Sequence, residues 1–370
     1  MSSKIVLSGY YGFNNAGDES VLYAIVTMFR KIDPDIEITV LSNDPVKTAK
    51  MYKVKAVPRW SWVQVFRAVR GCNLLISGGG SLLQDVSSKN SPLYYLAVIF
   101  IARFLGKPVH IFAQGIGPLT VKRNRRLAVW LLNHASAITV REAGSKDELL
   151  AMGVTKPIEV TADPVLGLSV ENVNEESAEA ILLRNNVCFT EEDKKLGVFI
   201  RPWADNAYIE ELAQALDQLC EQGWKIVFVP MQFPHDIPIA KETAKLMQHE
   251  VSILRELYSP QDILSIAQQF DVILGMRLHA LIDATVLGKP LVGLSYDPKV
   301  DRYLEQIGQV SLLSVNNLKA PTLIELIQWA YDNRVEMEAR LLERAKPLFQ
   351  KAWRNARVSL ELLPKPKTKF

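Results

Sequence analysis

Residues 74–85 read LLISGGGSLLQD, an uncharged apolar run that leads into three consecutive glycines. A short run of this kind is typical of a parallel strand that helices cover on both faces. The glycines predict a loop in which the backbone turns sharply and lies close to a ligand or to another loop. Residues 4–19 and 108–118 repeat the pattern of an apolar strand followed by a loop with glycines. The chain is therefore expected to begin as a parallel α/β sheet.

Apolar runs alternate with segments of helical period along the rest of the chain, which indicates βαβ units. Strands are expected near residues 4–9, 36–41, 54–57, 73–77, 108–114, 137–141, 157–161, 196–201, 225–230, 251–254, 271–275 and 291–295. Helices are expected near residues 19–31, 61–70, 93–105, 121–135, 143–152, 177–185, 206–222, 237–248, 260–269, 278–287 and 320–350.

A polar and acidic stretch at residues 171–195 interrupts this alternation and is expected to separate two domains. The predicted fold class is α/β, with two Rossmann-like domains facing across a cleft. The N-terminal domain is placed at residues 1–175 and the C-terminal domain at 190–345. Residues 346–370 are expected to form the end of a helix and a tail.

Composition excludes several classes of protein. The 370 residues carry 43 basic and 40 acidic side chains, a balance that argues against a nucleic-acid-binding protein. The three cysteines have neither metal-site nor redox spacing, which fits a reducing compartment. No signal peptide is expected before the first strand, and the apolar run at 93–105 is too short to span a bilayer. A cytoplasmic protein is therefore predicted.

The first loop, residues 9–19 (GYYGFNNAGDE), lacks the Gly-Lys-Ser/Thr of a P-loop and the glycine spacing of a dinucleotide fingerprint. Its adjacent amides, Asn14 and Asn15, can hold sugar hydroxyl groups. The alternative is that both amides cap the local turn, and Asp18 can cap the helix that follows.

Four more positions, at a strand end or in the loop after a strand, are candidates for sugar binding. The backbone of Gly79 and Gly80 can lie against a ligand, and Gln114, at the end of its strand, can bind a hydroxyl group. Asp85 can act as a base or hold a hydroxyl group, or it can be an ordinary capping acid.

Residues 275–281 (GMRLHAL) join a strand to a helix, so Arg277 and His279 are expected at a helix N-terminus, where an anion is favoured. Arg277 can donate two hydrogen bonds to a carboxylate or a phosphate, and His279 can supply a proton near neutral pH. Lys299 and Arg201, which also follow strands, are further candidate anion ligands. Arg141 and Asp163 close strands too, and an ion pair is the favoured interpretation of Asp163.

The helix expected near 61–70 places Trp62, Val65, Phe66 and Val69 on one face, with arginines beside them. This face predicts either contact with a membrane surface or, as the favoured alternative, a crossover helix packed on its sheet.

Taken in order, these motifs resemble the polysaccharide pyruvyl transferase family, over about residues 4–305. The motifs are the first loop, the triple-glycine loop, AQGIGP at 113–118, Arg141-Glu142, Asp163-Pro164, Arg201-Pro202, MRLHA at 276–280 and SYDPK at 295–299. The chain is most similar to bacterial members that pyruvylate secondary cell-wall polymers, which anchor surface-layer proteins.

The resemblance implies a fold like that of GT-B glycosyltransferases and phosphoenolpyruvate as the donor, with no metal or other cofactor. It implies a ketal-linked pyruvate on a sugar, expected to be N-acetylmannosamine, of a lipid-diphosphate-linked precursor. In the family the Arg-Leu-His triplet is associated with donor binding and catalysis, which corresponds to Arg277, Leu278 and His279.

With this chemistry, His279 is the expected general acid, and Arg277, Lys299 and Arg201 are the expected donor ligands. Asn14, Asn15, Gly79, Gly80 and Gln114 are assigned to the acceptor, and Asp85 is a candidate catalytic carboxylate. Two alternatives remain open: a GT-B glycosyltransferase that uses a nucleotide sugar, and a non-catalytic carbohydrate-binding protein.

Overall fold

The computed structural model of the chain describes residues 3–85, 88–309 and 313–364. The chain divides into two compact units, each built on one parallel sheet. Unit 1 contains Met1–Phe13, Val21–Leu168 and Leu348–Phe370. Unit 2 contains Asn14–Ser20 and Ser169–Pro347. Both units thus include a segment that is distant in sequence from the rest of the unit.

The sheet of unit 1 has seven strands in the order β3-β2-β1-β4-β5-β6-β7. They are β1 (Lys4–Ser8), β2 (Glu37–Ser42), β3 (Lys55–Pro58), β4 (Leu74–Gly78), β5 (Val109–Gln114), β6 (Ala137–Val140) and β7 (Glu159–Val160). The helices between them are α1 (Ala16–Ile32), α2 (Pro45–Tyr52), α3 (Trp62–Gly71), α4 (Ser91–Phe104), α5 (Lys122–Asn133) and α6 (Ala143–Met152). The order of the strands reverses between β1 and β4.

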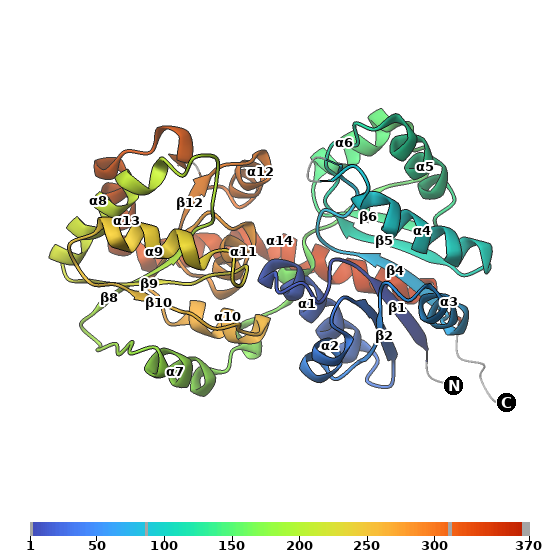
Figure 1. The fold of residues 1–370 in the computed structure, drawn as a ribbon, viewed down its shortest axis with the longest axis horizontal. Coiled ribbons are helices and arrows are strands. Elements are labelled where there is room, and N and C mark those ends of the chain that lie inside the picture. Colours follow the sequence, from blue (N-terminus) through green and yellow to red (C-terminus); the bar gives the residue numbers. More distant parts are fainter. Residues whose placement is uncertain (1–2, 86–87, 310–312, 365–370) are drawn as a thin grey trace. The chain divides into compact units, whose positions relative to one another are not determined.

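Helices cover both faces of this sheet. Contacts link α3 to α4, α4 to α5 and α5 to α6, so these four helices form a row on one face (Figure 1). Crossover connections between parallel strands are right-handed, which places α1 and α2 on the opposite face. The buried core between the row and the sheet includes Val65, Val69, Ile99, Ile111 and Leu131.

The sheet of unit 2 has six strands in the order β10-β9-β8-β11-β12-β13. They are β8 (Lys194–Phe199), β9 (Trp224–Phe228), β10 (Ser252–Ile253), β11 (Val272–Gly275), β12 (Leu291–Ser295) and β13 (Leu313–Ser314). The helices are α7 (Glu175–Arg184), α8 (Tyr208–Glu221), α9 (Ile237–Leu246), α10 (Pro260–Gln268), α11 (Leu278–Leu287), α12 (Pro298–Gln306), α13 (Ala320–Asp332) and α14 (Arg334–Glu361). Short 3₁₀ turns of this unit lie at Val170–Asn172 and Val315–Asn317, and another, Pro164–Gly167, belongs to unit 1. Here the order of the strands reverses between β8 and β11.

The single helix expected at 320–350 is two helices in the structure. α13 ends at Asp332, where the N–H of Asn333 bonds back to Trp329, and α14 then runs from Arg334 to Glu361. Two helices that the sequence analysis did not predict, α2 and α12, both begin with a proline after a capping aspartate. That pairing is a start signal that could have been recognised.

The end of the helix expected at 346–370 is the last part of α14, and the structure groups it with unit 1. The buried Asn355 contacts Thr161 Oγ1 at 2.8 Å and donates to the carbonyl of Ala162 at 3.1 Å. The buried Ser359 hydroxyl lies 2.7 Å from His110 Nδ1. The remainder of the predicted tail, residues 365–370, lies outside the described residues.

His110 makes the fit of α14 sensitive to acid. The side chain is fully buried, and its Nε2 lies 3.1 Å from Thr139 Oγ1. Burial, together with the smaller effect of the positive charge of Arg354, lowers the pKa of His110 to about 3. The native state therefore keeps this imidazole neutral at a pH at which the unfolded chain takes up a proton.

We expect the free energy of unfolding to fall as the pH drops below about 6.5, the ordinary histidine pKa, by up to about 1.4 kcal/mol per pH unit. Replacing the imidazole, as in His110→Gln, should flatten this dependence in urea titrations at several pH values. The exposed His134 is the matched control, and His134→Gln should retain the wild-type slope. An equal slope in wild type and His110→Gln would contradict this assignment.

Candidate functional site

Four loops of unit 2 follow the carboxyl ends of neighbouring strands. In an open parallel sheet, ligands bind at this edge, next to the point where the strand order reverses. Arg201 follows β8 and Arg277 follows β11, the two strands that flank the reversal. Gln232 follows β9, and Tyr296 follows β12. The parallel register of the sheet therefore brings these four side chains to one edge.

Arg277 is held by a buried carboxylate. Its Nε donates to Asp236 Oδ2 at 3.1 Å, and its Nη2 donates to Asp236 Oδ1 and to Gln232 Oε1. The Asp236 side chain is 1% exposed and that of Arg277 is 12% exposed. From its sequence context, Arg277 was predicted to donate two hydrogen bonds to a carboxylate or a phosphate. The structure instead engages Nε and Nη2 within the protein, so the orientation of the guanidinium is fixed before any ligand arrives.

Asp236 also fixes the loop that precedes it. Its Oδ2 accepts hydrogen bonds from the backbone N–H groups of Met231 at 3.1 Å and Gln232 at 2.9 Å. Neither Gln232 nor Asp236 was predicted as a site residue. The prolines at 230, 234 and 238, directly after an apolar strand, are a signal of a rigid loop that could have drawn attention to them.

The second half of the first loop, Asn14–Ser20, is part of unit 2 and lies along this same β9–α9 loop. The N–H of Ala16 donates to the carbonyl of Met231 at 2.7 Å, and the N–H of Phe233 donates to the carbonyl of Asn14 at 3.2 Å. Between these bonds, Asn15 and Gln232 form an antiparallel bridge. The sequence analysis placed Asn14 and Asn15 in the N-terminal domain. The backbone pairing with 231–233 explains why the structure groups them with unit 2.

Gly17 lies against the imidazole of His279. A Cβ atom at Gly17 would stand 2.4 Å from His279 Nδ1, which is closer than any real contact. The absence of a side chain at this position of α1 is therefore required by the position of the histidine. His279 is the second residue of α11, and Arg277 is the cap that precedes this helix. The predicted Arg277 and His279 thus lie together at the N-terminus of α11, with Leu278 buried between them.

The amide of Asn15 caps its own turn. Its Nδ2 donates to Asp18 at 2.6 Å, and its Oδ1 accepts from the N–H of Gly17 at 3.2 Å. The structure therefore shows the local capping alternative for Asn15. Asn14 adopts a left-handed backbone conformation with φ of 59°, which asparagine tolerates better than most residues.

Arg201 is the cation of the site that has no carboxylate within ion-pair distance among the described residues. Its Nη1 donates to the hydroxyl of Tyr296 at 3.0 Å. Its guanidinium carbon lies 4.9 Å from the ring centroid of Tyr296 and 5.8 Å from that of Trp203. Lys299 Nζ lies 5.4 Å from the Tyr296 ring and 3.5 Å from Asp297, with more than a third of its side chain exposed. The ring of Tyr296 therefore lies beside both predicted cations, Arg201 and Lys299.

Tyr208 lies near both sets of charges in the site, the Arg277–Asp236 pair and Arg201. Its hydroxyl donates to the carbonyl of Arg201 at 2.6 Å. Burial raises the pKa of Tyr208, the Asp236 carboxylate raises it further, and Arg201 and Arg277 oppose this rise. The phenol thus senses the charges of both groups and stays protonated at neutral pH.

The other predicted acceptor residues lie in unit 1, where they bond to or pack against residues of the same unit. Gln114 is fully buried, and its Nε2 donates to the carbonyl and the hydroxyl of Ser77 at 3.1 and 3.0 Å. Gly79 and Gly80 have φ of 67° and 70°, and a Cβ at Gly79 would lie 1.9 Å from Val21. Both glycines are thus explained by the turn and by packing in their own unit.

Asp85 holds a loop in place. The side chain is 4% exposed and accepts hydrogen bonds from the backbone of Thr120 at 2.8 Å and of Val121 at 2.9 Å. Burial alone would raise the pKa of Asp85, but these donors hold it below its ordinary value. A strong general base would need the opposite shift, so the structure supports the capping interpretation.

The ion pair expected for Asp163 is confirmed. Arg141 Nη1 lies 3.0 Å from Asp163 Oδ2, and both side chains are buried in unit 1. Glu142 contacts the same guanidinium at 3.0 Å. Among the described residues, no three His, Cys, Asp or Glu side chains converge as the ligands of a metal ion would.

Solved structures with a similar fold cover nearly the whole chain. The UDP-GlcNAc 2-epimerase of Methanocaldococcus jannaschii superposes with a TM-score of 0.68 at 15% identity, over 98% of this chain and 100% of its own. The UDP-GlcNAc 2-epimerase of Neisseria meningitidis, bound to UDP-GlcNAc, gives 0.66 at 14% identity over 98% and 100%. A glycosyltransferase of Rickettsia africae gives 0.67 at 11% identity over 99% and 100%. The predicted fold class, two Rossmann-like α/β domains of the GT-B-like kind, is confirmed.

Sequence comparison is more specific than the fold. The sequence model of the polysaccharide pyruvyl transferases matches residues 15–298, which is well over half of the 370 residues. The matched region begins in the loop that lies beside His279 and ends at the SYDPK loop that carries Tyr296. The chain belongs to the polysaccharide pyruvyl transferase family.

Proposed function

We propose that the protein transfers the enolpyruvyl group of phosphoenolpyruvate to a sugar of a cell-envelope polysaccharide precursor, forming a ketal and releasing phosphate. The observation that carries the donor assignment is Arg201. It is held at the strand-order reversal by Tyr296 and Trp203, and no described carboxylate neutralises it. The family supports the class of reaction, and the uncompensated charge of Arg201 supports an anionic donor.

The reaction sets clear demands on a site. A proton must be added to the methylene carbon of the donor, which leaves a cationic centre at the neighbouring carbon. The first sugar hydroxyl adds to that centre and loses its proton, which returns to the acid. The bond to phosphate then breaks, and the second hydroxyl closes the ketal while its proton leaves with the phosphate. The site must therefore bind two anionic groups and place one acid.

We assign the acid to His279. Nδ1 of the imidazole faces Gly17, and the bare backbone there leaves room for the ring. Arg201 and Lys299 bind the phosphate and carboxylate of the donor, together with the N-terminal N–H groups of α11. Arg277 contributes with Nη1 and orients the start of α11, because its Nε and Nη2 are held by Asp236 and Gln232.

The acceptor is proposed to be N-acetylmannosamine in a lipid-diphosphate-linked oligosaccharide on the cytoplasmic side of the membrane, in the synthesis of a polymer that anchors a surface layer. Asn14 and the glycine loops stay candidates for acceptor contacts through their backbone. Asp85 is proposed to support the fold of its loop and not to act as a base. No metal or other cofactor is proposed beyond the co-substrate.

The proposal is tested by incubating the purified protein with phosphoenolpyruvate and an acceptor disaccharide diphosphate that carries a terminal N-acetylmannosamine. Release of phosphate in step with a mass gain of one pyruvate ketal is expected. Binding of phosphoenolpyruvate without product would reject this acceptor. Absence of donor binding would reject the proposed function.

The second candidate is transfer from a nucleotide sugar, which the similarity to a glycosyltransferase and to two sugar-nucleotide enzymes favours at the level of the fold. Competition separates the two. Phosphoenolpyruvate should protect the protein against thermal unfolding, whereas UDP-sugars should neither protect it nor displace the donor.

Removing the proposed acid should slow the chemical step. We expect His279→Ala to fold normally and to lose roughly 10²-fold or more in turnover, the usual effect of losing a positioned acid. His249, an exposed histidine of unit 2 paired with Asp217, provides the control His249→Ala, which should retain activity. Turnover of His279→Ala at the wild-type rate would exclude this residue from the mechanism.

Filling the space beside the imidazole should have a similar but smaller effect. Gly17→Ala must displace His279, so we expect turnover to fall about tenfold or more. Thermal unfolding of the variant shows whether the fall in turnover is accompanied by a loss of stability. Gly71→Ala is the matched control, since a Cβ there meets nothing within 4 Å. Unchanged kinetics in Gly17→Ala would show that the position of the imidazole does not matter.

Loss of a donor ligand should appear mainly in binding. Arg201→Met and Lys299→Met are each expected to raise the KM for phosphoenolpyruvate about tenfold, with a smaller effect on kcat, because the contact exists before the transition state. Lys319, an exposed lysine of unit 2 paired with Glu211, provides the control Lys319→Met. Steady-state kinetics with varied donor measures the difference, and an unchanged KM in both variants would remove these cations from the donor site.

A further inference from the structure

Charge is distributed very unevenly along this chain. Between Pro45 and Arg141 there are 15 lysines and arginines but a single acidic residue, the buried Asp85. The remainder of the chain carries 28 basic and 39 acidic residues. The near balance of the whole sequence therefore conceals a strongly basic segment, and this segment builds α3, α4 and α5 of unit 1.

These three neighbouring helices expose large apolar side chains on the side that faces away from the sheet. In α3 the structure corrects the expected apolar face, because Val65 and Val69 are fully buried while Trp62 and Phe66 are 45% and 37% exposed. The helix is packed on its sheet, which was the favoured interpretation of its sequence. It nevertheless exposes two aromatic rings to solvent.

The exposed rings continue across α4 and α5. Phe100, Phe104 and Trp130 are 48%, 76% and 49% exposed. The centroid of Phe100 lies 6.4 Å from that of Phe104 and 6.3 Å from that of Trp130, so the three form one cluster. We call the outer surface of α3, α4 and α5 the aromatic face; its exposed apolar side chains are Trp62, Val63, Phe66, Phe100, Phe104 and Trp130.

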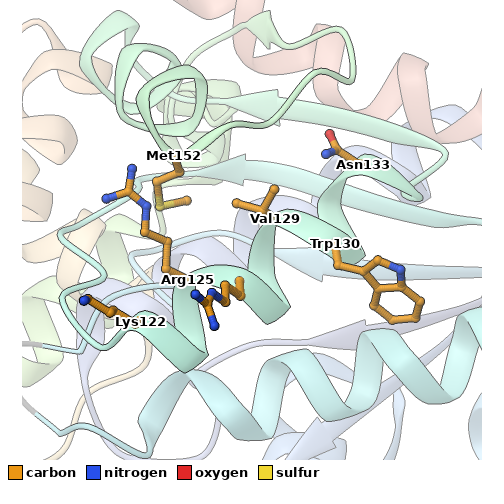
Figure 2. Close-up of a pocket in the computed structure, with 7 residues that line it drawn as sticks. Lys122, Arg125, Val129, Trp130, Asn133 and Met152 are labelled. Atoms are coloured by element: carbon orange, nitrogen blue, oxygen red, sulfur yellow. The ribbon is translucent and has the colours of Figure 1, made fainter.

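Cations surround these rings on all three helices. The exposed ones are Arg67, Arg70, Arg103, Lys122, Arg123, Arg125 and Arg126. Two open pockets combine both kinds of side chain. One, of about 410 Å³, lies on α3 between Trp62 and Arg70. The other, of about 560 Å³, is lined by Lys122, Arg125 and Arg126 at one end of α5 and by Trp130 and Met152 (Figure 2).

We propose that the aromatic face binds the surface of a bilayer that contains anionic phospholipids. Aromatic rings partition into the interface between headgroups and acyl chains, and nearby lysines and arginines are attracted to the negative surface potential. The face supplies both, with no exposed carboxylate in the segment from Pro45 to Arg141 to oppose them. A basic pocket of the size seen on α5 accommodates a lipid phosphate headgroup. Across the described residues no helix is long and apolar enough to cross a bilayer, so the contact is peripheral.

A nucleic-acid duplex would bind the cations through its phosphates but would leave the exposed phenylalanines of α4 without a role, because its bases are stacked on one another. The proposal rests on charge and exposed apolar surface alone. It is therefore independent of the reaction that the protein catalyses, and the two can fail separately.

The test is co-sedimentation of the full chain with vesicles of phosphatidylglycerol and phosphatidylcholine in equal parts, or of phosphatidylcholine alone. We expect binding to the anionic vesicles at about 0.05 M salt and a marked loss at about 0.5 M. Trp62→Ser/Phe104→Ser/Trp130→Ser and Arg123→Glu/Arg126→Glu should each weaken binding about tenfold or more. Trp329 of unit 2 is 52% exposed and gives the matched control Trp329→Ser, which should bind like wild type.

Unfolding curves establish that each variant is folded, and turnover on a water-soluble acceptor should remain at the wild-type level in all of them. Absence of binding to anionic vesicles at low salt would overturn the proposal. Vesicle binding that is weakened neither by the triple substitution nor by the double substitution would also overturn it. Tighter binding to duplex DNA than to the anionic vesicles would do the same.

Discussion

The buried carboxylate of Asp236 is the interaction on which the site of unit 2 depends. It joins three parts of the chain, since it accepts bonds from the backbone at 231–232 and from Arg277, and the same loop pairs with Asn14 and Ala16. An ion pair this deeply buried is not a large source of stability by itself. Breaking it costs about 3–5 kcal/mol, because a charge would remain buried without its partner. The main effect of the Arg277–Asp236 pair is therefore to hold the start of α11 in one geometry, and its contribution to stability is small.

The N-terminal loop illustrates how the chain assembles this site from distant segments. Its first half stays with the sheet of unit 1, while Asn14–Ser20 joins unit 2 and brings Gly17 to the imidazole of His279. α14 does the reverse, because it starts in unit 2 and buries Asn355 and Ser359 in unit 1. Two helices, α1 and α14, thus belong to both units, and a division of the sequence into consecutive domains cannot represent them.

Much of the fold was predictable because it depends on local pattern. Apolar runs ending in glycine located the strands, and the strand-to-helix loop at 275–281 correctly placed Arg277 and His279 at a helix N-terminus. Polar residues after strands were harder to assign, because their partners are distant in sequence. Asp85 is held by donors 35 and 36 residues away, and the partner of Arg277 lies 41 residues before it. No local pattern distinguishes a carboxylate that holds a loop from one that faces a substrate.

The distribution of charge within the site then decides which residues can attract an anionic ligand. Asp236 offsets the charge of Arg277, so this pair presents little net field to an approaching anion. Arg201 is held by a phenol and two aromatic rings, none of which carries a formal charge, so its field is not cancelled. Arg277, next to His279, is thus suited to orientation, and Arg201, across the strand-order reversal, is suited to the attraction of an anion. In the proposed function, a donor attracted by Arg201 binds at the strand edge that also carries His279, whose position is set by Gly17 and α11.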